Sequence, residues 1–185
     1  LAEIIPALPG DLGVPVLVVQ HMPPRFTQLL AERLDTASAL SVTEGAAGDQ
    51  VVPNHVYIAP GGYHMRVRRV GARVAITLDR GEPVHSCRPA VDCLFDAAVD
   101  VWGGRLLGAV LTGMGVDGRD GSRRVVESGG RVIAQDAETS VVWGMPGAVT
   151  EAELADAVLP IDAIAGELTR RIRSLRAPLR AVGEG

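Results

Sequence analysis

The sequence contains no lysine, so all 18 of its basic residues are arginines. This excludes Schiff-base catalysis by a lysine and a Walker-type phosphate loop, because both need that side chain. Acidic residues outnumber basic ones by 22 to 18, and the net charge of −4 argues against a nucleic-acid-binding protein. No apolar run approaches the ~18 residues that span a bilayer, so we expect no insertion into a membrane.

Cysteine is also scarce, with only Cys87 and Cys93 in 185 residues. No metal-ligand spacing surrounds either residue, so both fit the pattern of ordinary thiols in a cytosolic protein. We therefore expect a cytoplasmic location and neither a metal nor another cofactor. Cys87 has no candidate base beside it except His85, which argues against a cysteine nucleophile.

The residues that are present suit one globular domain with a sizeable core, since 47% are hydrophobic and 22% are charged. Short apolar, β-branched runs alternate with segments of helical spacing. The predicted strands are Val14–Gln20, Leu40–Thr43, Val56–Ala59, Leu106–Leu111 and Arg131–Gln135. The predicted helices are the later part of one over Leu1–Gly10, then Phe26–Leu34, Pro89–Trp102, one that ends near Gly129, and Ile161–Leu175.

One segment in the middle of the chain departs from this alternation. His64–Val70 and Arg73–Leu78 alternate apolar and polar residues around Gly71, which predicts an antiparallel hairpin. The other strands alternate with helices, which implies right-handed crossovers. The expected fold class is therefore α/β, with a doubly wound, mostly parallel sheet and an inserted antiparallel hairpin. We expect the last residues, Ala181–Gly185, to be frayed.

The stretch Leu106–Gly118 is the most informative part of the chain. An apolar run breaks there into the turn GMGVDG, which contains a carboxylate, Asp117. Sites in open parallel sheets form at the carboxyl ends of strands, and His21 follows another predicted strand, so the two residues can meet above one edge of the sheet. A carboxylate that orients a histidine is the supporting half of a nucleophile–histidine–acid system. Each residue also has a structural interpretation, His21 as a strand-end histidine that the backbone satisfies and Asp117 as a helix cap.

The same turn has a second functional interpretation. Gly113, Gly115 and Gly118 form the G-x-G-x-x-G pattern of dinucleotide-binding loops, and Asp136 follows the next strand, where a ribose-binding acid would stand. Against this interpretation, Asp117 would place a negative charge beside the pyrophosphate. The sequence pattern alone leaves a catalytic acid loop and a dinucleotide loop as alternatives.

Six segments of the chain together resemble a known family. They follow one another between about Val16 and Val149: QHMPPRFT, AERL, YIAPGGYHMRV, RPAVDCLFDAA, GAVLTGMGVDG and AQDAETSVVWGMPGAV. In this order they resemble the catalytic domain of the chemotaxis protein-glutamate methylesterases, the CheB family. The resemblance implies a doubly wound α/β hydrolase with a Ser-His-Asp site. It also implies a substrate, the glutamyl methyl esters on the cytoplasmic region of chemoreceptors, and in some members the deamidation of glutamines.

The resemblance also assigns site residues. The family's histidine lies in the motif matched by QHMPP, which implies His21, and its aspartate lies in the motif matched by GMGVDG, which implies Asp117. The backbone N–H of Met114, in that second motif, is implied as an oxyanion donor. The family's serine lies in a glycine-rich turn for which this chain has no counterpart, and Leu1 corresponds to a position shortly after that turn.

None of the serines in the chain lies in that missing motif; they include Ser38, Ser86, Ser122 and Ser140. We therefore expect residues 1–185 to be a catalytic domain that lacks its N-terminal nucleophile turn and is inactive without it. The receiver domain that usually precedes the catalytic domain in this family is likewise expected upstream. A dinucleotide-dependent enzyme and a non-catalytic domain that binds chemoreceptors are the alternatives.

Overall fold

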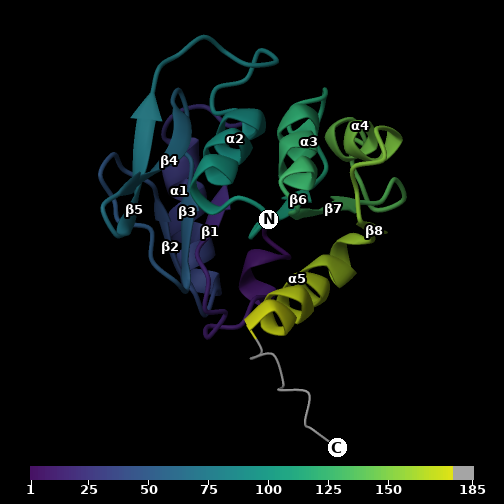
Figure 1. Cartoon of the computed structure of the whole chain (residues 1–185), viewed down its shortest axis with the longest axis horizontal. Helices are drawn as coiled ribbons and strands as arrows, with labels where there is room; N and C mark the ends of the chain where they lie inside the picture. Colours follow the sequence, from purple (N-terminus) through teal and green to yellow (C-terminus); the bar gives the residue numbers. More distant parts are fainter. Residues whose placement is uncertain (177–185) are drawn as a thin grey trace, which may run out of the picture.

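A computed structural model of the protein describes residues 1–176, so the expectation for Ala181–Gly185 lies outside the described residues. The strands are β1 (Val16–Val18), β2 (Ser41–Glu44), β3 (His55–Ile58), β4 (His64–Val70), β5 (Arg73–Asp79), β6 (Leu107–Val110), β7 (Arg131–Gln135) and β8 (Ala157–Leu159). The helices are η1 (Ile5–Ala7), a 3₁₀ helix, and α1 (Phe26–Ala37), α2 (Val91–Trp102), α3 (Arg119–Glu127), α4 (Met145–Glu151) and α5 (Ile161–Arg176). Figure 1 shows their arrangement.

The parallel strands form two sheets of three, in the orders β1-β3-β2 and β6-β7-β8, and β4 pairs with β5 in an antiparallel hairpin. The predicted α/β class, the parallel strands and the hairpin are therefore confirmed. The expected single sheet differs from the structure, because within residues 1–176 β1 and β6 each have one hydrogen-bonded neighbour and do not pair with each other. These two edge strands carry the loops that hold His21 and Asp117.

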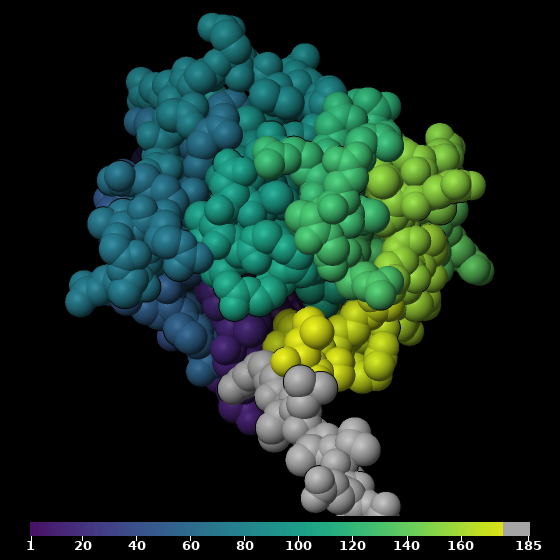
Figure 2. All heavy atoms as spheres, viewed as in Figure 1, coloured from purple at the N-terminus to yellow at the C-terminus, as the bar shows by residue number. Residues whose placement is uncertain are grey.

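Helices cover both faces of the parallel sheets. Successive side chains of a strand point to opposite faces, so each strand packs against helices on both sides. In β3, Val56 packs in the same cluster as residues of α1 and α5, whereas Tyr57 packs with Leu94 of α2. In β7, Ile133 joins the cluster of Val56, whereas Val132 packs against α3 and α4. Both sheets thus share one core. Figure 2 shows the teal α2 and the green α3 side by side on the face that it views, and the two helices contact each other.

The first ten residues do not form the regular helix end that the sequence predicts. Only Ile5–Ala7 are helical, and they form a 3₁₀ turn, because Pro6 and Pro9 have no N–H to donate to a continuing α-helix. Two short elements, α4 and β8, have no signal in the sequence: α4 spans seven residues and contains both a proline and a glycine, and β8 has only three residues. Among residues 1–176, no helix combines the length and the hydropathy that crossing a membrane requires.

Candidate active site

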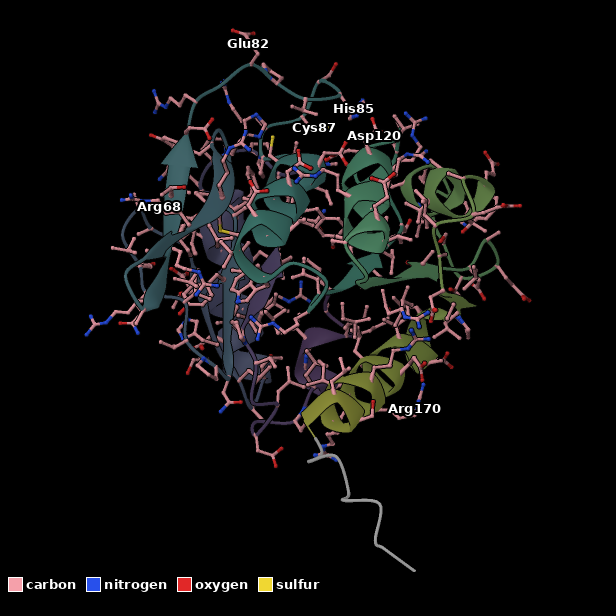
Figure 3. The ribbon with its side chains drawn as sticks, viewed as in Figure 1. Arg68, Glu82, His85, Cys87, Asp120 and Arg170 are labelled. Carbon is pink, nitrogen blue, oxygen red and sulfur yellow. The ribbon has the colours of Figure 1, made fainter. Side chains whose placement is uncertain are left out.

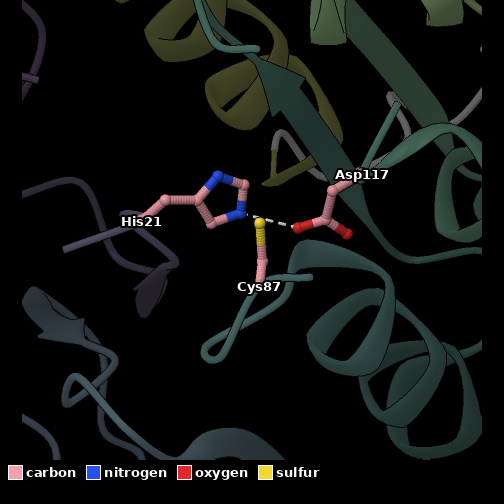
Figure 4. Close-up of side chains that lie close together, drawn as sticks. All are labelled: His21, Cys87 and Asp117. Carbon is pink, nitrogen blue, oxygen red and sulfur yellow. Dashed lines mark hydrogen bonds and ion pairs between the residues drawn. The ribbon is translucent and has the colours of Figure 1, made fainter. Parts of the chain in front are cut away.

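His21 and Asp117 form a hydrogen bond where the loops after β1 and β6 meet (Figure 4). The distance from His21 Nε2 to Asp117 Oδ2 is 2.7 Å. The Asp117 side chain is 1% exposed, whereas that of His21 is 24% exposed. The carboxyl ends of the two edge strands thus bring together a buried acid and a histidine that remains accessible from solvent.

The carboxylate of Asp117 is held from a second side by the first turn of α2. The Val91 N–H donates to Oδ2 at 2.7 Å, and the Asp92 N–H donates to Oδ1 at 3.0 Å. Burial opposes ionisation of Asp117, but the hydrogen bonds from His21, Val91 and Asp92 outweigh it and lower the pKa of this carboxyl. Asp117 is therefore an ionised, fixed acceptor. It is also a helix cap, though for α2 rather than for α3, the helix that follows it in the chain.

The hydrogen bond to Asp117 assigns different roles to the two ring nitrogens of His21. An ionised carboxylate only accepts, so Nε2 carries the hydrogen of the neutral imidazole and Nδ1 is the basic nitrogen. No residue in the part of the chain that the structure describes hydrogen bonds to Nδ1. A nucleophile that approaches Nδ1 could transfer its proton there, while Asp117 stabilises the resulting cation.

The glycine turn beside this pair presents a backbone donor. The Gly113 N–H donates to Val142 O at 3.0 Å, and Gly113 O accepts from the Met145 N–H at 2.8 Å, which ties the turn to the start of α4. Gly115 has a φ of +84°, a conformation that favours glycine. The N–H of Met114, between these glycines, has no hydrogen-bond acceptor within residues 1–176. It is available to a developing oxyanion.

Asp92 supports the site from the second position of α2, and no pattern in the sequence points to it. Its Oδ1 accepts from the N–H groups of Gly118 at 3.0 Å and Gly121 at 2.7 Å, and its Oδ2 lies 3.1 Å from His85 Nε2. Burial and the nearby charge of Asp117 raise the pKa of Asp92. An acid in the first turn of a helix is common, and its partner on another helix cannot be identified from spacing.

Cys87 also lies at the site, which the sequence does not predict. Its Sγ and one donor atom each of His21 and Asp117 all lie within 4.8 Å of one another (Figure 4). The prediction that only His85 could be a base near Cys87 is therefore wrong, because the fold brings a distant loop to this thiol. Burial and then the charge of Asp117 raise the pKa of Cys87, which opposes formation of a nucleophilic thiolate.

The structure does not support a dinucleotide site at the glycine turn and Asp136. Asp136 Oδ1 accepts from both the N–H and the hydroxyl of Thr139, which closes the turn after β7. Asp117 stays ionised inside the glycine turn, where it would repel a pyrophosphate. No serine among the described residues hydrogen bonds to His21, and Ser140 donates instead to Asp136 O.

Comparison with known proteins gives consistent matches over most of the chain. A family model described as CheB methylesterase matches residues 1–168. The chain is 51% identical over 176 residues to protein-glutamate methylesterase/protein-glutamine glutaminase 2 of Caulobacter vibrioides, which covers 95% of this chain and 51% of that protein. It is 52% identical over 185 residues to a protein-glutamate methylesterase/protein-glutamine glutaminase of Symbiobacterium thermophilum, which covers 100% of this chain and 48% of that protein. The chain thus spans about half the length of the curated relatives it matches.

A solved structure also matches the fold of this chain. The crystal structure of the Thermotoga maritima CheB methylesterase catalytic domain has a TM-score of 0.90 and 44% sequence identity. The match covers 92% of this chain and 90% of that chain.

Proposed function

Because this chain belongs to the CheB methylesterase family, we propose that it hydrolyses glutamyl methyl esters on the cytoplasmic region of chemoreceptors and releases methanol. Its relatives carry the name protein-glutamine glutaminase as well, so the same site would release ammonia from receptor glutamines. The observation that carries the proposal is the 2.7 Å hydrogen bond between the ionised Asp117 and the accessible His21. Such a pair activates a hydroxyl nucleophile.

We place the nucleophilic serine on a strand that lies between β1 and β6 and comes from a segment before Leu1. Among the described residues each of these strands has one hydrogen-bonded neighbour, so each has an edge with backbone groups that no other strand there pairs. Val16 of β1 and Leu107 of β6 pack against the same hydrophobic cluster, so the two edges border one core. A parallel strand between them would join the two sheets, and its carboxyl end would emerge between the loops of His21 and Asp117.

The chemistry follows from the atoms that face this position. The serine Oγ attacks the ester carbonyl as His21 Nδ1 takes its proton, and Asp117 stabilises the imidazolium through Nε2. The Met114 N–H donates to the oxyanion, a contribution of about 3 kcal/mol for one such donor. His21 then gives its proton to the departing methanol. Water, deprotonated in turn by Nδ1, attacks the acyl-serine and releases the free glutamate, and His21 returns the proton to the serine Oγ.

The proposal extends to the organisation of the whole protein. Residues 1–185 form the catalytic domain, a receiver domain precedes it, and the protein acts in the cytoplasm, where the receptor region that it demethylates lies. The curated relatives support this organisation because they are about twice as long as the matched region.

The test is an assay of the chain joined to the segment that precedes it, with a methylated receptor segment as substrate. We expect methanol from methyl esters and ammonia from glutamines. A domain that only binds receptors would bind the segment without releasing methanol. A dinucleotide enzyme would instead bind a reduced nicotinamide cofactor, which a fluorescence titration would detect. The Asp136→Ala substitution would then abolish that binding. Either of these results overturns the proposed function.

A further inference from the structure

Three side chains from three separate loops place nitrogen, sulfur and oxygen donors around one point. Cys87, in the loop between β5 and α2, directs its Sγ toward the hydrogen bond between His21 and Asp117 (Figure 4). The thiol is partly exposed, as is the imidazole, so an ion can reach the cluster from solvent. We propose that His21, Cys87 and Asp117 bind a thiophilic divalent cation such as Zn²⁺, and that the bound ion inhibits the hydrolase.

The donor set and its dimensions suit this class of ion. Thiolate, imidazole and carboxylate are the three protein ligands of Zn²⁺, with metal–ligand bonds of about 2.0–2.3 Å. Ligand atoms around one tetrahedral ion therefore lie about 3 to 4 Å apart. The three donors already lie within 4.8 Å of one another, so small side-chain shifts suffice. The largest is the opening of the 2.7 Å contact between Nε2 and Oδ2.

The charge of Asp117 also favours a cation at this point. The ionised Asp117 makes a thiolate at Cys87 unfavourable, which is part of the reason that the pKa of this thiol is raised. A divalent cation between the two groups replaces their repulsion with coordination of both. Binding therefore releases the thiol proton to solvent, and affinity rises with pH.

Binding at this point would remove the base that the proposed mechanism needs. The ion occupies Nε2, so the hydrogen of the neutral imidazole moves to Nδ1, which can no longer accept a proton from serine. The inhibitory part of this inference rests on the proposed function, whereas metal binding does not.

A second cluster consists of His85, Asp92 and Asp120 and serves as the internal comparison. Figure 3 labels two of its members, His85 and Asp120. This cluster contains no sulfur. Its Asp120 forms an ion pair with Arg119. A metal bound there would give no thiolate signal.

The binding test uses the whole chain with Cd²⁺ as a spectroscopic probe and Zn²⁺ in calorimetry. We expect one ion per chain and the ultraviolet charge-transfer absorption of a Cd²⁺–thiolate bond. Cys87→Ser should abolish this absorption and weaken Zn²⁺ binding about 10- to 100-fold, with an unchanged circular dichroism spectrum. Cys93→Ser is the matched control, because Cys93 is buried at 5% exposure, and it should leave both signals intact.

Each other outcome overturns a defined part of the inference. An absent thiolate band, a band that persists in Cys87→Ser, or binding that only His85→Ala removes would overturn the site. The inhibitory part is tested by methanol release from the chain joined to its preceding segment. Zn²⁺ should suppress this release, and a chelator should restore it. In the Cys87→Ser variant, the release should be less sensitive to Zn²⁺. Release that Zn²⁺ leaves unchanged while the band is present overturns inhibition alone. A band from a protein that releases no methanol under any condition contradicts the proposed function and leaves the site standing.

Discussion

Asp117 and Asp92 cap each other's helices: Asp117 caps α2, which contains Asp92, and Asp92 caps α3, which follows Asp117. Asp117 accepts the first N–H groups of α2, including that of Asp92 itself, and Asp92 accepts those of Gly118 and Gly121 at the start of α3. The carboxylate that orients His21 is thereby fixed by the first turn of α2, and Asp92 ties that turn to the start of α3. Removing it should affect both the chemistry and the packing of α2 against α3.

Asp117→Asn should lower the rate of methanol release by roughly 10⁴-fold, the loss measured when the orienting acid of a serine hydrolase triad becomes an amide. The amide oxygen can still accept from one of the two α2 N–H groups, which donate to separate oxygens of the carboxylate, so the variant should remain folded. Loss of the charged acceptor should cost about 1 kcal/mol in the free energy of unfolding. Urea unfolding and methanol release from the same preparation measure both effects. An active Asp117→Asn variant with normal stability would contradict the assignment.

The stability lost in Asp117→Asn should depend on pH. The pKa of Asp117 is lowered in the folded protein, so its ionised form contributes stability that is fully present above about pH 4, its ordinary pKa. This contribution is lost as the pH falls through the lower, folded-state pKa. The difference in free energy of unfolding between the wild type and Asp117→Asn should therefore shrink on acidification, measured by urea unfolding at a series of pH values. A difference that grows on acidification would mean that this pKa is raised instead.

Gly144→Ala should disturb the turn that presents the Met114 N–H. A Cβ at Gly144 would lie 2.7 Å from Gly113 O and 2.8 Å from Gly115 N, and backbone at these distances must move. We expect a loss of about 10²-fold in kcat, as when one oxyanion donor is removed. Gly166→Ala is the matched control, because no atom of residues 1–176 outside the adjacent backbone of α5 lies within 4 Å of its Cβ position. That substitution should leave kcat unchanged and stabilise the protein by about 0.5–1 kcal/mol.

Gly61→Ala should displace the loop that carries His21. The new Cβ would lie 2.5 Å from both Pro23 C and Pro24 N, and 2.7 Å from Met22 O. Because overpacking of this kind costs about 1–3 kcal/mol, we expect reduced stability together with reduced kcat. Nitrogen NMR of the His21 ring should show the hydrogen bond to Asp117 weakened. An unchanged His21 signal would show that the loop yields without moving the imidazole.

Much of the fold follows from the sequence because its strands are continuous β-branched runs between clear helix and turn signals. Arg131–Gln135 is predicted to the residue, and the hairpin nearly so. β8 has only three residues, and the seven residues of α4 make fewer than two full helical turns and include a proline and a glycine, so neither element sets up a recognisable periodicity. The division into two sheets leaves no trace in local patterns, because it depends on which strand edges meet.

The site is predictable only in part, for a related reason. His21 and Asp117 each follow a strand that the sequence predicts for a parallel sheet, so their meeting at the carboxyl ends of the strands can be expected. Asp92 lies at the start of α2 and Cys87 in the loop before it, so the positions of both depend on how α2 packs. No spacing in the sequence indicates that these residues lie near His21. The role of Nδ1 as the basic nitrogen also requires the observed contact at Nε2.

The most direct measurement compares His21→Ala with His55→Ala in the chain joined to its preceding segment. His55 lies at the start of β3, where it forms a hydrogen bond with Thr43 and stacks on the ring of Tyr57. Its removal should therefore leave the proposed site unchanged. We expect His21→Ala to lower kcat/KM for methanol release by roughly 10⁴-fold or more and His55→Ala to retain it. Undiminished methanol release by a folded His21→Ala variant would contradict the proposal that His21 is the general base of this esterase.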